Sequence, residues 1–316
     1  MESYTVCQLQ RDIRFDGILL VRSAEKRTDS KGRDYLDMNL ADRTGEINAK
    51  DWNYQQGKGI PGTGKPVRVT GMVQEYNGRL QMRIETWRPC TETDRVDMRA
   101  LVPAAPRDPK EMTEQIEQTI ESFRNEDLRK LTRGMLEIAG ERLKWFPAAQ
   151  RMHHAERSGL LHHTTDMLRI AEAVLGTYPW LNRDLLLAGV IIHDLGKIEE
   201  MKSDEAGNVT DYTMEGQLLG HLVRGITNLN RAAEKTGVSG ECVVLLEHML
   251  LSHHGESEYG SPKPPMFAEA EALHWIDMMD ARMNTMKTVT DKTPAGAFSE
   301  KIFSLDRRVY HPLMDS

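Results

Sequence analysis

The sequence predicts two domains of different class, an all-β barrel followed by an all-α helical bundle. Three observations support this prediction: apolar residues alternate with period two before position 90, they form helical stripes after position 112, and a proline-containing stretch lies between. The chain has 316 residues, which is enough for two domains of ordinary size. We therefore expect a multidomain protein with domains over residues 1–90 and 112–316 and a linker over 91–111.

The first ninety residues have the pattern of about five short strands. Leu36, Met38 and Leu40 alternate with polar residues, which is typical of a half-buried strand. Residues 42–45 (DRTG) and 76–79 (YNGR) are typical of hairpin turns. So many short strands in so short a segment predict a small barrel, and the OB-fold is the natural candidate among small barrels.

An OB-fold binds single-stranded nucleic acid on an open strand face with aromatic and basic side chains. The candidate nucleic-acid-binding residues are Tyr35, Trp52, Tyr54, Arg79 and Arg83. The alternative is that the aromatic residues belong to the core or rim of the barrel. The charge distribution fits polyanion binding at this end, because the first 90 residues carry 15 basic and 12 acidic residues and the remainder carries 26 and 36.

Residues 91–111 carry Pro103, Pro106 and Pro109 in a polar setting without periodicity, as in a linker stiffened by proline. No apolar run reaches the length of a membrane span, and no basic segment followed by an apolar stretch marks a signal peptide. Three scattered cysteines form no CxxC pair. We therefore expect a cytoplasmic protein with no membrane partner.

Histidine is confined to the second module, since all eleven histidines lie at or after position 153. Asn182 is predicted to cap an almost wholly apolar helix that ends at Gly196, which places His193 and Asp194 at a buried helix end. A buried, ionised carboxylate must be paired or must coordinate a metal. A satisfied His–Asp pair in the core is the alternative for this dipeptide.

Four further segments each place a histidine or a carboxylate on the apolar side of a predicted helix. In the helix from Leu160, position 163 lies on the apolar stripe and position 162 on the polar face, so His163 is the inward residue. His221 lies three residues after Leu218 on another apolar stripe, next to Gly220, which leaves room for close approach.

The other two segments leave alternatives open. His253 continues the apolar stripe of the helix from Glu241, and His254 lies beside it. In the helix from Phe267, Asp277 and Asp280 lie on the same face, so spacing alone admits either as an inward ligand.

Imidazoles mixed with carboxylates suit Mn, Fe, Co, Ni or Zn, and suit Mg less well. Six or seven ligands exceed one tetrahedral site, and a carboxylate can bridge two ions about 4 Å apart, as two-metal hydrolysis of phosphoesters requires. The sequence therefore predicts a two-ion site within residues 145–285, with Asp194 as its bridge and His193 beside it. Lys197 follows closely and is predicted to hold a phosphate.

The order of these residues resembles the HD superfamily of metal-dependent phosphohydrolases, with HDLGK at 193–197 as the central motif. Further phrases resemble the YhaM family of 3′-to-5′ exoribonucleases, which places an OB-fold ahead of an HD domain. These phrases are FPAA at 146–149, HHA at 153–155, GLLHHT at 159–164, SHHG at 252–255 and GSPK at 260–263.

This resemblance implies the metal ligands His163, His193, Asp194, His221, His253, His254 and Asp277. It also implies manganese-favoured removal of nucleotides from the 3′ end of single-stranded RNA, with single-stranded DNA as a further substrate, and release of nucleoside monophosphates by a homo-oligomer. Two alternatives remain: an HD enzyme acting on a nucleotide or cyclic dinucleotide, and a non-enzymatic single-strand binder with a structural metal. His153 and His154 are expected to contact substrate or to form structural hydrogen bonds.

Overall fold

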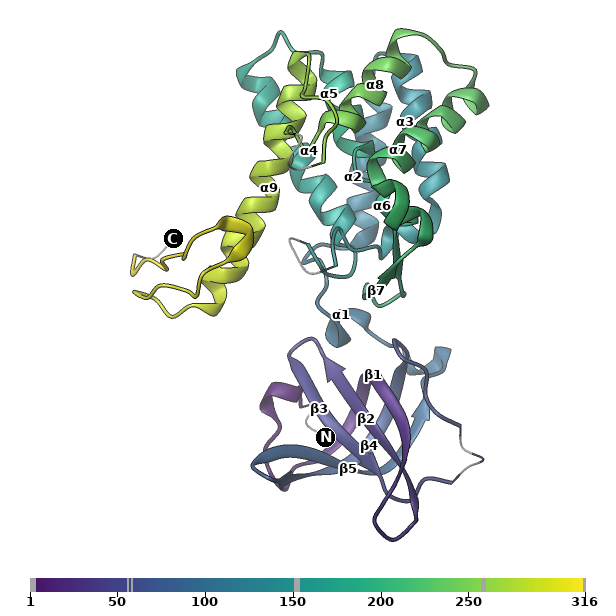
Figure 1. The fold of residues 1–316 in the computed structure, drawn as a ribbon, viewed down its shortest axis with the longest axis vertical. Helices are drawn as coiled ribbons and strands as arrows, with labels where there is room; N and C mark the ends of the chain where they lie inside the picture. Colours follow the sequence, from purple (N-terminus) through teal and green to yellow (C-terminus); the bar gives the residue numbers. More distant parts are fainter. Residues whose placement is uncertain (1–3, 56, 58, 151–153, 257–259, 315–316) are drawn as a thin grey trace. The chain divides into compact units, whose positions relative to one another are not determined.

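The computed structural model describes residues 4–55, 57, 59–150, 154–256 and 260–314. The chain divides into two compact units, residues 1–104 with 204–206 and residues 105–203 with 207–316. The first unit is a β-barrel and the second is mostly helical (Figure 1).

Five strands close the barrel of the first unit in the order β1-β2-β3-β5-β4, which is the strand order of an OB-fold. The strands are β1 (Arg14–Thr28), β2 (Asp34–Asp42), β3 (Gly45–Asp51), β4 (Pro66–Tyr76) and β5 (Arg79–Pro89). Both predicted hairpin turns are present, since β2 pairs with β3 and β4 pairs with β5 around them. The predicted alternation is confirmed as well: Leu36, Met38 and Leu40 are buried in the barrel core.

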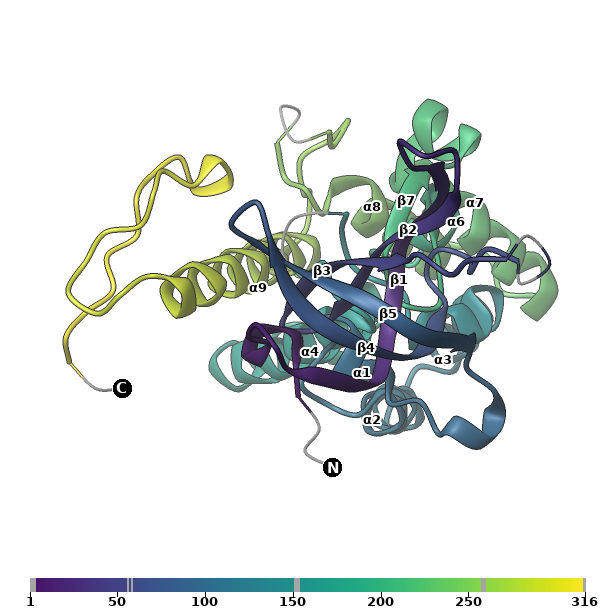
Figure 2. The same ribbon diagram turned by 90° about the horizontal axis from the view of Figure 1, so that it is seen from below.

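The second unit is built from helices around one apolar core (Figures 1 and 2). Its α-helices are α2 (Pro109–Glu121), α3 (Glu126–Ala139), α4 (Gly159–Thr177), α5 (Arg183–Ile192), α6 (Lys197–Glu200), α7 (Met214–Thr236), α8 (Glu241–Ser252) and α9 (Ala268–Lys292). The 3-10 helix η4 (Gly140–Lys144) follows α3. Helix α5 is the most apolar, and all but its first residue are buried, so it lies inside the bundle.

A short hairpin of β6 (Met201–Ser203) and β7 (Val209–Tyr212) interrupts the helices at a polar stretch that has no helical periodicity. The region expected as linker contains α1 (Met98–Leu101), and α2 begins at Pro109, where Asp108 caps the helix.

The last described segment of the chain is not α-helical. After α9, the segment from Thr293 to Met314 forms an irregular hairpin joined by the bridges Phe298–Tyr310 and Ile302–Arg307, with the 3-10 helix η6 (Phe303–Leu305) at its turn. Pro294 and Gly296 follow α9 directly and disfavour further helix. Figures 1 and 2 both show α9 extending past the other helices and carrying this segment.

None of the helices among the described residues is long and apolar enough to cross a bilayer.

Candidate metal centre

Helix α5 places His193 and Asp194 deep in the second unit. The side chain of Asn182 accepts a hydrogen bond from the backbone N–H of Leu185 at 3.1 Å, as predicted for the helix cap. The helix ends at Ile192, and the next two residues are 1% and 3% exposed. The predicted burial of this dipeptide is confirmed.

The remaining predicted histidines and Asp277 converge on the same place from four other segments. His163 comes from α4, His221 from α7 just after a kink at Gly220, and the histidine pair from the turn after α8. Ring centroids of neighbouring imidazoles lie 5.3 Å apart for His163 and His193, and 5.1 Å apart for His193 and His253. The inward direction predicted for His163 is confirmed, because its side chain has no exposed surface.

Asp194 lies between two triads of candidate ligand atoms. One triad is His163, His193 and Asp277, and the other is His221, His253 and His254; within each triad the atoms lie within 4.8 Å of one another. Asp194 Oδ2 is 3.4 Å from His193 Nε2, and Oδ1 is 3.5 Å from His221 Nε2. The two oxygens of one carboxylate therefore face different triads, which is the arrangement a bridging ligand needs.

Hydrogen bonds on the far side of each ring fix which nitrogen faces the centre. His193 Nδ1 lies 2.8 Å from the carbonyl of Val190, and His253 Nδ1 lies 2.9 Å from the carbonyl of Leu250. A carbonyl only accepts, so each Nδ1 donates and each Nε2 keeps its lone pair. His221 Nδ1 lies 3.2 Å from Glu200 Oε1, which orients that ring in the same way.

The donor set fits a divalent metal. Among the described residues, the buried atoms Nε2 of His193, His221 and His253 and Oδ1 of Asp194 have no hydrogen-bond partner. Leaving one such group unsatisfied costs about 1–3 kcal/mol, so four in one place are expensive unless another group binds them. Lone pairs on neutral imidazoles and a carboxylate are suitable ligands for a first-row divalent cation.

The charge states of Asp194 and His253 match those of metal ligands. Burial opposes the ionisation of Asp194, but the Lys197 ammonium outweighs it and holds the pKa of this carboxyl well below its usual range. Burial, followed by the neighbouring His254, holds the pKa of His253 well below its usual value. An ionised carboxylate beside a neutral imidazole is the form that binds a metal.

The structure separates the two aspartates that spacing left open. Asp277 Oδ1 lies 3.2 Å from His163 Nε2, on the side of the ring that faces the centre. Asp280 Oδ2 lies 2.6 Å from His163 Nδ1 and 2.8 Å from His154 Nε2, behind the ring. Asp277 is thus placed to be a ligand, and Asp280 is placed to orient one.

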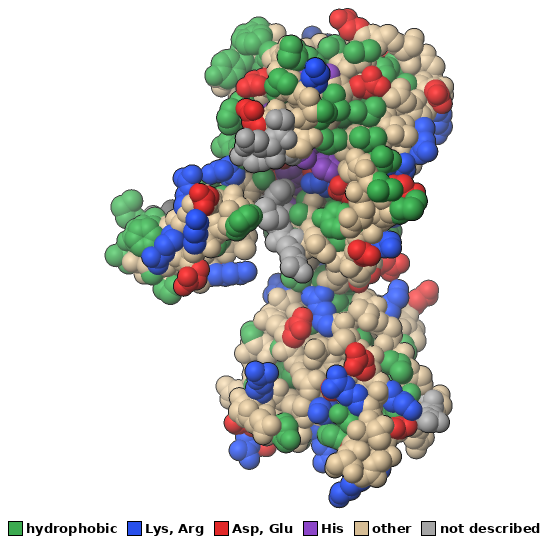
Figure 3. Space-filling model, in the orientation of Figure 1, with side chains coloured by type: hydrophobic (Ala, Val, Ile, Leu, Met, Phe, Trp, Pro, Cys, Tyr) green, Lys and Arg blue, Asp and Glu red, His purple; other side chains and the backbone are tan. Residues whose placement is uncertain are grey.

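A cavity of about 390 Å³ opens beside these groups, and Asp194, Lys197, His254 and Asp277 line one end of it. Figure 3 shows histidine side chains at the bottom of a hollow on the face of the helical unit. Lys197 Nζ lies 2.6 Å from Asp194 Oδ2, so its ammonium is next to any phosphate held in this cavity.

Known proteins share the helical unit with this chain. The HD domain family matches residues 160–282. The "3′-5′ exoribonuclease YhaM" of Listeria monocytogenes serotype 4b (strain CLIP80459) is 41% identical over 302 residues, which are 95% of this chain and 96% of the relative. Its counterpart from Bacillus subtilis (strain 168) is 39% identical over 297 residues, 94% of each chain.

The chain belongs to the YhaM family.

Solved structures similar to this YhaM family member match part of the chain. One is the second OB-fold domain of replication protein A from Methanococcus maripaludis, at 15% identity and a TM-score of 0.23, over 29% of this chain and 97% of that one. Another is a replication protein A heterotrimer bound to single-stranded DNA, with the same identity and TM-score, over 29% of this chain and 69% of that one.

The barrel of this family member carries an aromatic and basic cluster on its outer face. The rings of Tyr35 and Trp52 stack with centroids 4.5 Å apart, and Lys50 Nζ lies 5.3 and 5.4 Å from them. Arg83 and Trp52 line one surface hollow. The structure thus brings together three of the predicted nucleic-acid-binding residues, Tyr35, Trp52 and Arg83, and adds Lys50. Strand alternation could have predicted Lys50, because it lies two residues before Trp52 and so on the same face.

The other two predicted residues of the barrel lie apart from this cluster. Arg79 starts β5, four residues before Arg83 and roughly 13 Å along the strand. Tyr54 packs partly against the barrel core, as the alternative interpretation held for the aromatic residues.

A second histidine cluster lies behind the metal centre. His162 Nδ1 is 2.8 Å from Glu156 Oε1 and 3.1 Å from His154 Nδ1, and His162 Nε2 is 3.3 Å from Asp166. Burial opposes a charge on His162, but Asp166 and Glu156 outweigh it and raise its pKa to about 9. Both ring nitrogens of His162 face carboxylates of this second cluster, Glu156 and Asp166, and not the groups around Asp194. His153 lies outside the described residues.

Glu156 gives this cluster a measurable pH dependence. Burial favours the neutral acid, but His154 and His162 outweigh it and lower the pKa of Glu156 to about 2 from 4.5. A carboxylate with a lowered folded-state pKa stabilises the fold above its unfolded pKa, and this contribution disappears as the pH falls toward the folded value. We expect Glu156→Gln to be less stable than the parent at pH 7, with a difference that shrinks between pH 4.5 and 2 in chemical denaturation. A constant difference across that range would contradict the assignment.

Asp280 is expected to control metal affinity without touching the metal. Asp280→Asn keeps the size of the side chain but weakens the charge-assisted bond that orients His163. Loss of such an outer partner typically lowers metal affinity or activity about 10- to 100-fold. Titration of metal-free protein with Mn²⁺, followed by calorimetry, should show this loss, whereas Asp291→Asn, an exposed change on the same helix, should not.

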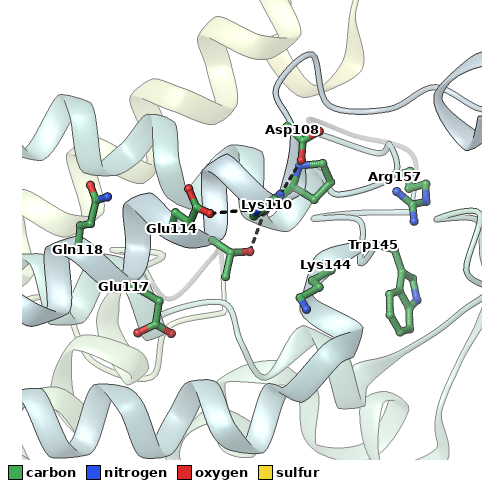
Figure 4. A pocket seen from close by; sticks show the side chains of 10 residues that line it. Asp108, Lys110, Glu114, Glu117, Gln118, Lys144, Trp145 and Arg157 are labelled. Carbon is green, nitrogen blue, oxygen red and sulfur yellow. Dashed lines mark hydrogen bonds and ion pairs between the residues drawn. The ribbon is translucent and has the colours of Figure 1, made fainter.

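Another cavity of the helical unit, about 680 Å³, has no histidine among its lining residues (Figure 4). It lies along α2 and includes Lys144, Trp145 and Arg157 on its other side. Lys110 on α2 pairs with Glu114 at 3.8 Å. This mixture of opposite charges does not point to a catalytic site.

Proposed function

We propose that this protein is a metal-dependent 3′-to-5′ exoribonuclease that hydrolyses the phosphodiester bonds of single-stranded RNA and releases nucleoside monophosphates. The observation that carries the proposal is Asp194, whose two oxygens face separate triads of buried ligand atoms. The relatives that share about 40% of the sequence over nearly the whole chain are named for this activity.

The proposed ligands are the six triad residues and the aspartate between them: His163, His193, Asp194, His221, His253, His254 and Asp277. Two divalent ions, Mn²⁺ being favoured over Fe, Co, Ni, Zn or Mg, would supply an activated water and neutralise charge on the phosphoryl oxygens. Asp194 would hold both ions in place, and His193, a ligand of one of them, is fixed by its bond to Val190. The Lys197 ammonium, which is bonded to Asp194 Oδ2 in this structure, would bind a phosphate oxygen of the substrate instead. It would then place a positive charge at the scissile phosphate.

The two units divide the work in this proposal. Residues 1–90 bind the single strand through Tyr35, Trp52, Arg79 and Arg83, with Lys50 among them, and residues 112–316 hydrolyse its 3′ end. Single-stranded DNA fits the same groups, because stacking and backbone contacts depend little on the sugar. Assembly as a homo-oligomer and a cytoplasmic location stay predictions.

The test is incubation with 5′-labelled single-stranded RNA and Mn²⁺, with and without EDTA. The proposal predicts a ladder that shortens from the 3′ end only without EDTA. Intact RNA together with cleavage of small nucleotides or cyclic dinucleotides would identify a small-substrate HD enzyme instead. RNA binding with no cleavage of either kind would identify a non-enzymatic single-strand binder.

The barrel cluster gives a separate prediction. Tyr35→Ala with Trp52→Ala should weaken binding of single-stranded RNA substantially, since base stacking is worth about 1–3 kcal/mol per base. Tyr76→Ala, an exposed aromatic elsewhere on the barrel, is the matched control and should bind normally. Fluorescence anisotropy in EDTA measures binding without cleavage, and equal affinities for all three proteins would exclude this face.

A further inference from the structure

The cavity beside the metal centre has a second end that the ligands do not explain. Its outer walls are Met278, Ala281, Arg282 and Thr285 from α9, together with Ser304 and Leu305 from the C-terminal segment. The volume of about 390 Å³ is within the range of small-molecule sites. The cavity therefore has space for one nucleotide-sized group beyond the proposed ligands.

One face of α9 runs from the metal centre into this space. Residues 277, 278, 281, 282 and 285 follow helical spacing, so they form a continuous stripe. Asp277 is the inner end of the stripe, and Arg282 lies about 7.5 Å further along the helix axis. A nucleotide whose phosphate is at Asp277 would thus have its ribose and base beside the rest of the stripe.

Arg282 is available to a ligand. Within the described part of the chain, its guanidinium forms no hydrogen bond or ion pair, although it lines the cavity. Lys197, at the inner end, is instead bonded to Asp194. The outer end thus offers a planar set of donors for hydroxyl or phosphate oxygens.

The C-terminal segment supplies the facing wall. Leu305 is 3% exposed although its neighbours Ser304 and Asp306 are exposed, so its side chain points inward. The bridges of Phe298 with Tyr310 and of Ile302 with Arg307 hold the turn that carries it. Met278 and Leu305 are the larger apolar side chains of this cavity, and such side chains fit the faces of a base.

We infer that this cavity is the subsite for the 3′-terminal nucleoside of the RNA, an inference that rests on the proposed function. Met278 and Leu305 contact the base, and Arg282 donates hydrogen bonds to the ribose hydroxyls, while the phosphate lies at the metal ligands. The C-terminal segment is then part of the substrate site. Ala281 keeps the middle of the stripe open, since a larger side chain there would fill the space.

The test compares three RNAs that differ only at the 3′ terminus: an ordinary nucleotide, an abasic ribose, and a 2′,3′-dideoxynucleotide. We expect the parent protein to remove each altered terminus about tenfold more slowly, because the site loses apolar contact with the first and hydrogen bonds with the second. Met278→Ala should lose the preference for a base and keep the preference for hydroxyls. Arg282→Met should lose the preference for hydroxyls and keep the preference for a base.

Met283→Ala is the control, because Met283 is an exposed residue of the same helix that does not line the cavity. It should keep both preferences of the parent. Equal rates for all three RNAs with the parent protein, or unchanged preferences in both variants, would overturn the inference.

A second readout does not depend on cleavage. RNA ending in 4-thiouridine, bound in EDTA and irradiated, should cross-link to peptides containing residues 278–285 or 301–307. Cross-links confined to other peptides would overturn the inference. If none of the three RNAs is shortened, the proposed function fails, and the cross-link then decides separately whether the cavity holds the terminal nucleoside.

Discussion

Asp194→Ala is expected to abolish RNA cleavage while leaving RNA binding mostly intact. The substitution removes the carboxylate whose two oxygens face both triads, so neither ion would be held in its proposed place. Removal of a central catalytic group lowers kcat by roughly 10³-fold or more. RNA binding should persist because the proposed binding residues lie on the barrel, in the other compact unit.

The matched control is Asp211→Ala, which removes an exposed carboxylate of the same unit. Single-turnover cleavage, fluorescence anisotropy and circular dichroism on both variants separate catalysis from binding and folding. Cleavage by Asp194→Ala at a rate close to that of the control would refute the mechanism. If the circular dichroism signal shows that Asp194→Ala does not fold, the same measurements are made on Asp194→Asn, which preserves the shape of the side chain.

Removal of metal is the second large expected effect. Chelation should reduce cleavage to background, and added Mn²⁺ should restore it. It should also lower the melting temperature, because a ligand present at 100 times its Kd stabilises the folded state by about 2.7 kcal/mol. The cause is local: without a cation, the buried nitrogens of His193, His221 and His253 have no partner among the described residues.

The control for this effect is Asp194→Ala itself, whose melting temperature should respond much less to EDTA. Differential scanning fluorimetry with and without chelator measures both proteins in parallel. A parent protein whose activity and melting temperature are both insensitive to prolonged chelation would show that these residues form a metal-free cluster.

The spacing of apolar residues predicted those ligands whose burial depends only on the helix that carries them. The apolar run before His193 could only be an interior helix, and Asn182 marked its start, so the position of Asp194 followed. The apolar stripe of α4 likewise distinguished His163 from its neighbour. The barrel followed from strand alternation and two hairpin turns, which are local signals as well.

Contacts between segments far apart in the sequence could not be predicted from the spacing of apolar residues. Asp277 and Asp280 lie on one face of α9, and only the position of His163 on α4 decides which carboxylate meets which ring nitrogen. Glu200, which orients His221, has no distinguishing sequence pattern. The hairpin after α9 was missed for another reason: the residues between its bridges show no regular alternation of apolar and polar side chains.

The most direct test of the two-ion site is anomalous diffraction at the manganese edge from crystals grown with Mn²⁺. Two peaks are predicted, about 4 Å apart. One should lie against His163, His193 and Asp277, the other against His221, His253 and His254, with one oxygen of Asp194 on each. A single peak, or peaks that Asp194 does not contact, would rule out a two-ion site bridged by Asp194.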